Sequence, residues 1–184
     1  NVLADGATAD RAIEALGKIK DKPFFLAVGF VKPHLPFVAP KKYYDLYPLE
    51  TIQPAGNPQP PQDVPDPALS NWGELRSYDG MPQKGPVSEE TARELIRGYR
   101  AATSYVDAQI GRVLDELERL GLSERTIVVL WGDHGWHLGE HGLWCKHTNF
   151  EGATRSLLVF RVPGVRTAGR TTAALAEFVD VYPT

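Results

Sequence analysis

The apolar positions of this chain follow helical spacing in two segments. Residues 8–19 carry apolar side chains every three to four positions, which predicts a short amphipathic helix. The same spacing recurs in residues 91–120, where it extends over many turns. This second segment starts at a candidate capping box formed by Thr91 and Glu94 and ends before Gly121, a typical helix terminator. We therefore predict a second, much longer helix there.

Three continuous apolar runs are short enough to be strands. They are "PFFLAVGF" at residues 23–30, "RTIVVLWGD" at 125–133 and "RSLLVFRVPG" at 155–164. Runs of this kind are typical of strands buried on both faces, as in a parallel sheet. The long helix between the first two runs then forms a right-handed crossover. The expected fold class is α/β, a sandwich with a mostly parallel sheet flanked by helices.

Residues 48–86 interrupt this pattern. They hold more than half of the chain's 15 prolines and show no sustained periodicity, which disfavours both helices and central strands. A segment this long without regular elements is expected to be functional when it lies inside a compact domain. We predict a proline-rich surface excursion or substrate-side loop within one domain over residues 1–184. Neither terminus resembles a natural boundary, so we expect a segment of a larger protein.

Composition and charge exclude several classes of partner. The 184 residues are 42% hydrophobic and 23% charged, as in ordinary globular proteins. A net charge of −3 supplies no cationic field for nucleic acid or acidic membranes, and no basic run is present. No apolar stretch approaches the ~20 residues that span a membrane. We expect neither a nucleic-acid nor a membrane partner.

Most of the candidate chemistry lies in "WGDHGWHLGEHGLWCKH", residues 131–147. Asp133 and His134 lie where the apolar residues of the second run end, and ligands of open α/β sheets collect outside the carboxyl ends of strands. Both residue types bind metals, and histidine also serves acid–base chemistry. Alternatively, Asp133 caps the next segment and His134 is an ordinary rim histidine. Position alone leaves both interpretations open.

Other residues of this segment give weaker signals. His137 and His141 have the spacing of a zinc-binding helix, but glycines interrupt the segment, so the two side chains need not share a helix face. We interpret both as loop residues or as supports for a site. Cys145 has only Lys146 beside it as an activating feature, which favours a small, half-buried thiol over a nucleophile.

His34 lies between two prolines in "KPHLPF", immediately after the first apolar run. The prolines restrict the backbone on both sides and would pre-organise the imidazole. Alone, His34 is best interpreted as an ordinary loop histidine. In a parallel sheet, however, it would face the same rim as Asp133 and His134.

These residues resemble the sulfatases of the alkaline-phosphatase superfamily, most closely their iduronate-type branch. The matching stretches include "PFFLAVGFVKPHLPF", "SYVDAQIGRVL", "DHGWHLGEHGLWCK" and "EFVDVYPT". The resemblance implies part of a three-layer, alkaline-phosphatase-like sandwich. It also implies hydrolysis of sulfate esters of sugars, a sulfated saccharide as substrate, and a periplasmic or secreted location.

The resemblance also implies roles for individual residues. Asp133 and His134 would be ligands of an active-site Ca²⁺, and Lys146 would contact the sulfate. His34 would act as sulfate ligand or proton donor to the departing alcohol, and Trp136 would line the sugar pocket. Calcium is implied by the resemblance alone, because an imidazole ligand by itself indicates Zn²⁺ or a transition metal such as Mn²⁺.

One part of the sulfatase pattern is absent from these residues. The family nucleophile is a formylglycine made in a Cys/Ser-x-Pro/Ala-x-Arg motif, and Cys145, followed by "KHTNF", does not fit it. We expect the nucleophile in a preceding N-terminal part of the same enzyme, which would be the partner of this segment. The segment alone is then inactive. Two alternatives remain: a phosphodiesterase or phosphonate monoester hydrolase of the same superfamily, and a non-catalytic module that retains the fold.

Overall fold

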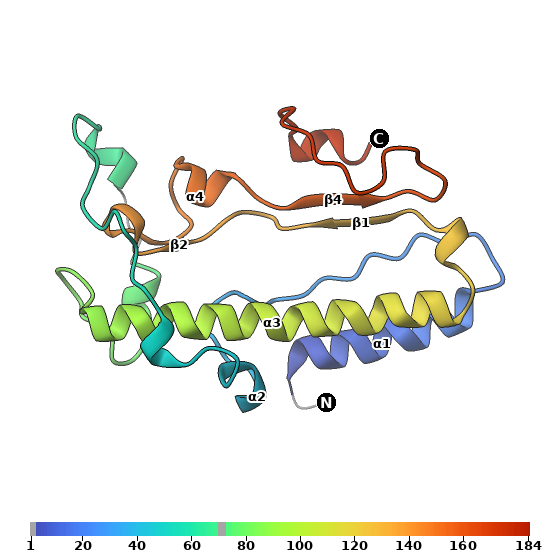
Figure 1. The fold of residues 1–184 in the computed structure, drawn as a ribbon, viewed down its shortest axis with the longest axis horizontal. Helices are drawn as coiled ribbons and strands as arrows, with labels where there is room; N and C mark the ends of the chain where they lie inside the picture. The colour runs from blue at the N-terminus through green and yellow to red at the C-terminus, as the bar shows by residue number, and fades with distance from the viewer. Residues whose placement is uncertain (1–2, 70–72) are drawn as a thin grey trace.

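The computed structural model describes residues 3–69 and 73–184 and is organised along one long helix (Figure 1). Helix α3, Glu89–Arg119, runs through most of the molecule. Its first turn is capped by Ser88, whose hydroxyl accepts a hydrogen bond from the Thr91 N–H, and not by the predicted box at Thr91. The predicted helix over 91–120 therefore exists, with a start two residues earlier.

Helix α1, Ala4–Ile19, packs beside the C-terminal half of α3 (Figure 1). Its apolar stripe buries Leu16 against Leu117 and Leu122, where the chain leaves α3. These side chains form a first hydrophobic cluster, because spacing at three to four residues places the apolar positions of each helix on one face. The short helix α2, Lys41–Tyr44, contacts the other half of α3. The two predicted helices are confirmed.

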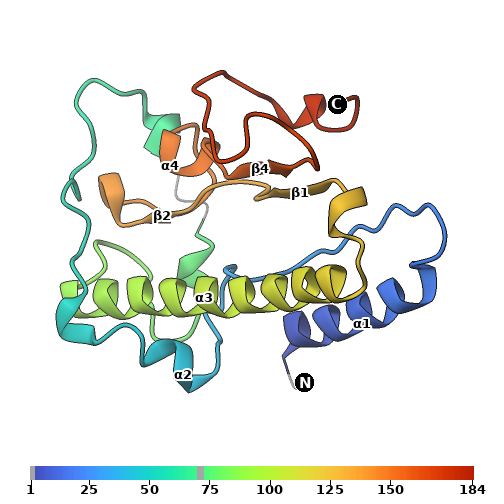
Figure 2. The ribbon, with the colours of Figure 1, turned by 45° about the vertical axis from the view of Figure 1, so that its right-hand side comes forward.

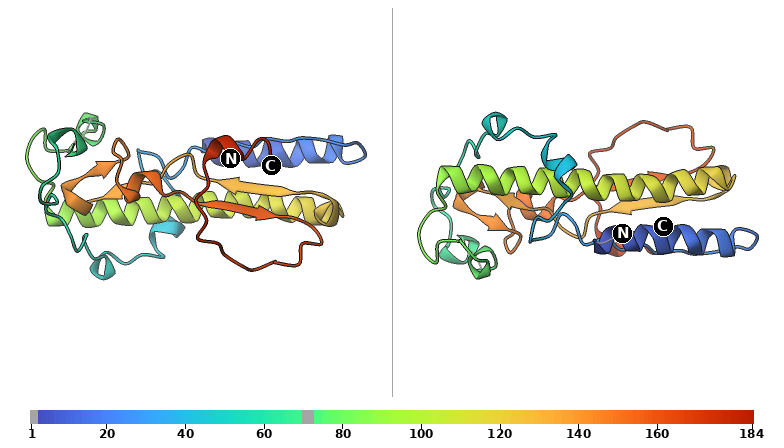
Figure 3. Two further views of the ribbon diagram at one scale, coloured as in Figure 1. Left: turned by 90° about the horizontal axis from the view of Figure 1, so that it is seen from above. Right: turned by 90° about the horizontal axis from the view of Figure 1, so that it is seen from below.

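Two small sheets lie over opposite halves of α3 (Figures 1 and 3). Strand β1, Val128–Trp131, pairs with β4, Leu158–Arg161, and β2, His137–Leu138, pairs with β3, Trp144–Cys145. Both pairings are antiparallel, so the predicted mostly parallel sheet is wrong for the strands that the structure describes. The reason is the connection from β1 to β4. It contains only a hairpin and the one-turn helix α4, Glu151–Thr154, whereas a parallel pair needs a crossover to the opposite end.

Residues 23–30 form extended backbone and not the predicted strand buried on both faces. Phe24 and Leu26 pack on this first cluster, while Phe25 between them is 93% exposed. The segment runs in the same direction as β1, toward the end of the molecule where α3 begins (Figures 1 and 2). No hydrogen-bonded ladder joins these two segments within the described ranges. An apolar run becomes a strand only when a neighbour satisfies its backbone groups.

The proline-rich excursion, residues 48–86, wraps around the end of the molecule where α3 begins (Figure 2). Its described parts form only single turns: Leu49–Thr51, Asp66–Leu69 and Leu75–Ser77. Two of its side chains anchor it, since Ile52 is fully buried and Leu75 is 4% exposed. Among the helices within 3–69 and 73–184, none combines the length and the apolar character that crossing a membrane requires.

Candidate active site

The loop after residues 23–30 holds His34 in a fixed orientation. Its backbone N–H donates to the Val31 carbonyl at 3.0 Å. Its Nδ1 lies 2.8 Å from the Leu35 carbonyl oxygen, which can only accept, so Nδ1 carries a proton. The Nε2 atom is therefore the ring nitrogen left for chemistry. Asp5 on α1 fixes the start of this loop by accepting from the N–H groups of Val31 at 2.8 Å and Lys32 at 2.9 Å.

Asp5 gives a first testable prediction. Its side chain is 2% exposed, and asparagine would keep its shape but leave one of the two backbone N–H groups facing an amide NH₂. Asp5→Asn should lower the free energy of unfolding by about 2 kcal/mol, the usual worth of a hydrogen bond to a charged group. The urea midpoint measures this change. Asp21→Asn, at an exposed position, is the matched control; equal midpoints for the two variants would contradict the prediction.

Lys146 and His34 meet although 112 residues separate them. Lys146 Nζ lies 2.8 Å from His34 Nε2 and 2.7 Å from Glu74 Oε1. The lysine side chain is only 16% exposed, and its ammonium lies 5.0 Å from the centroid of the Trp136 ring. Such a contact between a cation and an indole face is attractive and is strengthened by burial. The ammonium is thus held in a partly dry position beside Nε2 of His34.

Trp136 connects the predicted site residues. Its ring centroid lies 5.5 Å from that of His34 and 6.0 Å from that of His134. With Lys146 over the same indole, the structure brings His34, His134, Lys146 and Trp136 together around one aromatic side chain. This arrangement can hold an anion next to a basic ring nitrogen.

The Asp133–His134 turn presents two metal-ligand groups side by side. His134 Nδ1 lies 2.7 Å from the Gly135 carbonyl oxygen, so this nitrogen carries the proton and Nε2 offers its lone pair. That Nε2 atom lies 3.5 Å from Asp133 Oδ2. Glycine is required next in the chain, because a Cβ on Gly135 would come within 2.2 Å of the Gly152 carbonyl oxygen. The tight turn therefore fixes the orientation of the pair.

These two side chains are suited to form part of a metal site. The Asp133 side chain is 83% exposed, so its carboxylate is available to a cation. Ca²⁺ takes six to eight oxygen ligands, and even Zn²⁺ takes about four ligands in all. Within residues 3–69 and 73–184, no group of three or more histidine, cysteine, aspartate or glutamate side chains is placed to hold a metal. Asp133 and His134 could therefore supply one side of a coordination shell.

The structure also places the residues for which the sequence favoured a supporting role. His137 is 1% exposed in β2, where its Nε2 lies 2.7 Å from Thr148 Oγ1, and burial lowers the pKa of its imidazole. Cys145 in β3 is 2% exposed, so it is fully buried and not half-buried as predicted. Burial, assisted by the nearby Glu74 carboxylate, raises the pKa of the Cys145 thiol to about 12. Such a thiol stays protonated and is no nucleophile.

The buried thiol gives a second prediction. At pH 8.5 the thiolate fraction of Cys145 should be at least ~100-fold smaller in the folded protein than in urea, because an ordinary cysteine has a pKa near ~8.5. Iodoacetamide should therefore alkylate this residue slowly in the native state and rapidly in urea. Mass spectrometry of timed samples measures both rates, with a small cysteine peptide as the reference. Equal rates for the native protein and the peptide would refute the burial of the thiol.

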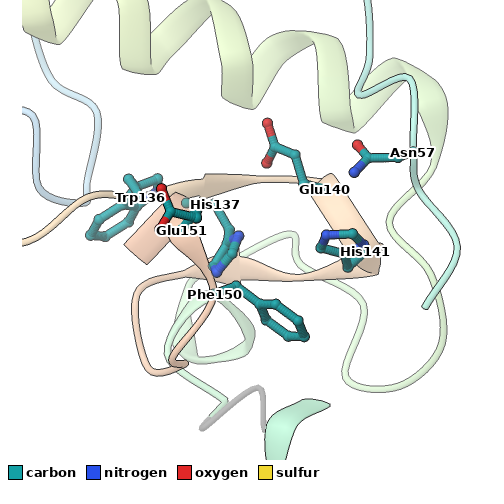
Figure 4. Close-up of a pocket in the computed structure, with 8 residues that line it drawn as sticks. Asn57, Trp136, His137, Glu140, His141, Phe150 and Glu151 are labelled. Carbon is teal, nitrogen blue, oxygen red and sulfur yellow. The ribbon is translucent and has the colours of Figure 1, made fainter. Parts of the chain in front are cut away.

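A cavity of about 360 Å³ adjoins Trp136 (Figure 4). Aromatic, imidazole and carboxylate side chains line it: Trp136, His137, Glu140, His141, Phe150 and Glu151, with Asn57 from the excursion. The His141 and Phe150 rings lie 5.0 Å apart on one side of it. Aromatic faces next to hydrogen-bonding groups suit a polar ring such as a sugar. The cavity thus offers room for an organic group next to the cluster around Lys146.

Comparison with known protein families matches residues 3–184 to the family described as Sulfatase. The chain belongs to the sulfatase family. It is 39% identical to iduronate 2-sulfatase of Mus musculus and 38% identical to that of Homo sapiens, each over 215 aligned residues. Each alignment covers 99% of this chain but 39% of the relative, so the chain spans about two fifths of their length. The resemblance stated from the motifs is confirmed.

Solved structures extend the sulfatase match to the fold. A phosphonate monoester hydrolase from Silicibacter pomeroyi aligns with a TM-score of 0.71 and 24% identity, covering 88% of this chain and 33% of that one. A protein solved with its substrate D-glucosamine-2-N,6-O-disulfate aligns with a TM-score of 0.70 and 22% identity, covering 87% and 43%. This sulfatase segment therefore has part of the alkaline-phosphatase-like fold, although its described sheets are antiparallel.

Glu74 is the site residue that the sequence did not indicate. It comes from the proline-rich excursion. Its Oε1 contacts Lys146 Nζ and lies 3.0 Å from His34 Nε2, and its Oε2 lies 3.3 Å from His147 Nε2. Burial raises the pKa of this carboxyl, but the hydrogen bond from Lys146 and the surrounding positive charge outweigh burial, so the net shift is downward. Glu74 is therefore a carboxylate at neutral pH, placed among three basic side chains.

Proposed function

We propose that this chain carries the sulfate-binding and leaving-group side of a sulfatase active site that acts on a sulfated saccharide. The observation that supports this most directly is the 2.8 Å approach of Lys146 Nζ to His34 Nε2. Two side chains so distant in the sequence are held at hydrogen-bonding distance, beside an indole ring and a cavity. Sulfate ester cleavage needs this pair of groups, a fixed cation and a proton donor.

The chemistry of the two groups differs. The Lys146 ammonium would lie against the sulfuryl oxygens, where it stabilises charge in a partly dry site. His34, with its Nδ1 proton already donated to the Leu35 carbonyl, would act in its imidazolium form: it would give the Nε2 proton to the departing alkoxide oxygen and become a neutral imidazole. The sugar ring of the substrate would pack on Trp136 and enter the adjoining cavity. Each residue is thus assigned one task in the same reaction.

Asp133 and His134 would hold the metal ion, for which we propose Ca²⁺ on family membership. A bound divalent cation supplies further positive charge for the sulfuryl group. The nucleophile, expected to be a formylglycine, has no matching motif in these 184 residues and would come from another part of the same enzyme. We further propose that residues 1–184 belong to a single catalytic domain, completed as a three-layer sandwich with a mostly parallel sheet. On family membership alone, we expect a periplasmic or secreted location.

A phosphonate monoester hydrolase is the second candidate, because the fold likeness to such an enzyme has a TM-score of 0.71. Matched aryl esters separate the two functions. The intact protein should hydrolyse 4-nitrophenyl sulfate with a kcat/KM at least ~100-fold above that for 4-nitrophenyl phenylphosphonate, a ratio worth about 2.7 kcal/mol of transition-state binding. The reverse order would favour phosphonate chemistry.

Hydrolysis of neither ester, together with no Ca²⁺ retained in equilibrium dialysis, would favour a non-catalytic module. Among saccharides, a 2-O-sulfated uronic acid is the first substrate to test, because two relatives at 38–39% identity are named iduronate 2-sulfatase. Sulfate release from a disaccharide that carries this group, compared with its 6-O-sulfated isomer, measures the preference.

A further inference from the structure

Glu74 already occupies the position where the proposed function places the sulfate. Its Oε1 lies 2.7 Å from Lys146 Nζ and 3.0 Å from His34 Nε2, and its Oε2 lies 3.3 Å from His147 Nε2. The carboxylate side chain is 19% exposed. Lys146 and His34 are the same groups that would contact the sulfuryl oxygens and the bridging oxygen of an ester. A carboxylate and a sulfuryl group cannot share these contacts, because both are anions and both need the same donors.

The backbone that carries Glu74 is fixed. Leu75 next to it is 4% exposed and packs with Leu35 and Cys145 in a second hydrophobic cluster. Arg76 then donates hydrogen bonds to the carbonyl oxygens of Pro82 at 2.6 Å and Gly85 at 2.7 Å. The excursion is therefore anchored on the C-terminal side of Glu74. Rotation of the Glu74 side chain would take the carboxylate away from these donors and leave the packing of Leu75 in place.

The Glu74 carboxylate is held incompletely. Its Oε2 is buried and has no hydrogen bond of good geometry among the described residues, although the His147 imidazole lies at ion-pair distance and the Cys145 thiol lies near the carboxylate. A buried acceptor without a hydrogen bond loses part of its solvation without replacement, so the bound position is less favourable than a fully satisfied one. Rotation of the side chain toward solvent would restore that hydration. These contacts are typical of a group that a stronger ligand can displace.

We propose that Glu74 is an internal anion that occupies the sulfate position in the absence of substrate and swings out when a sulfate ester binds. This inference rests on the proposed function, since it assigns the same donors to the ester. Glu74 then sets the affinity of the site for anions, because every ligand must displace it first. Weakly binding anions then fail to displace Glu74 from the sulfate position. A sulfate ester that also packs on Trp136 gains enough additional contact to displace it.

Isothermal titration of the intact protein with sodium sulfate, at constant ionic strength, tests this inference. Glu74→Gln keeps the shape of the side chain and removes the competing charge, so it should bind inorganic sulfate about tenfold more tightly than the unmodified protein, or tighter still. Glu50→Gln removes one charge at an exposed position of the same excursion and should bind sulfate as the unmodified protein does. Glu74→Ala should behave like Glu74→Gln.

The opposite result would overturn the inference. If Glu74 merely supports Lys146 and His34, Glu74→Gln and Glu74→Ala should bind sulfate equally or more weakly. Adding Lys146→Ala to Glu74→Gln should abolish the gained affinity; a persistent gain would mean that sulfate binds elsewhere and would also overturn it. The proposed function fails separately: an intact protein that hydrolyses sulfate esters but shows no gain with Glu74→Gln disproves only the role of Glu74. Absence of sulfate binding in every variant, with no ester hydrolysis, disproves both.

Discussion

Replacing Lys146 by alanine should lower kcat/KM for a sulfate ester by about 10²–10³-fold, the usual loss when one preorganised electrostatic donor is removed. The loss is large because the ammonium is 16% exposed and is held over the Trp136 ring, where little water screens its charge. Steady-state hydrolysis of 4-nitrophenyl sulfate by the intact protein measures it. Lys146→Arg should restore only part of the activity, since the guanidinium keeps the charge but not the compact shape.

Lys41→Ala is the matched control for Lys146→Ala. The Lys41 side chain is 85% exposed and pairs with Asp45 four residues further along the chain, so its loss should leave kcat/KM unchanged. Thermal melts of both variants check that neither has unfolded. A Lys146→Ala enzyme that keeps full activity would show that the sulfuryl group binds elsewhere.

Replacing His34 by alanine should produce a loss that depends on the leaving group. A proton donor contributes about 10²–10⁴-fold when the departing oxygen is a poor leaving group, such as the alkoxide of a sugar. It contributes little when the departing oxygen is a stable phenolate. His34→Ala should therefore lose much more activity toward a sulfated sugar than toward 4-nitrophenyl sulfate. Steady-state kcat/KM values for each substrate, with and without the substitution, measure the two losses.

The comparison of leaving groups distinguishes His34 from Lys146. Removal of the Lys146 ammonium should harm both substrates equally, because the sulfuryl oxygens are common to them. Equal losses for both substrates after His34→Ala would contradict the assignment of His34 as proton donor and would favour a role in binding the sulfate. The loop itself should persist in the variant, because Asp5 holds its start through the backbone of Val31 and Lys32.

Helices were predictable from this sequence, and strand pairing was not. The spacing of apolar residues over 8–19 and 91–120 is a local property, and each helix forms its hydrogen bonds within itself. Residues 23–30 have the composition of a buried strand, but their backbone groups need a partner elsewhere in the chain. The direction of β4 depends on the connection from β1, which contains the hairpin of β2 and β3. The strands of this hairpin are short and interrupted by glycines, so the sequence did not indicate them.

Some residues of the site were predictable and others were not. Short motifs with restricted neighbours indicated four of them, and the family resemblance added roles that spacing alone left open: His34, Asp133, His134 and Lys146. Glu74 had no such signal, because a single acid in a proline-rich segment has no periodicity that places it. Asp5 was hidden for a different reason: an acid in the first turn of a helix is usually explained by the helix dipole, and its contact with the His34 loop is tertiary.

The exposed apolar side chains near strand β1 have a practical consequence. Phe25 is 93% exposed, Leu157 57% and Trp131 51%, and β1 pairs only with β4 among the described strands. Apolar side chains beside an unpaired strand edge attract other copies and promote aggregation. Purified by itself, this stretch of 184 residues should precipitate or form mixed oligomers at concentrations needed for calorimetry. Expression yield and light scattering would then report self-association, and a sulfate titration would have to be made on the intact protein.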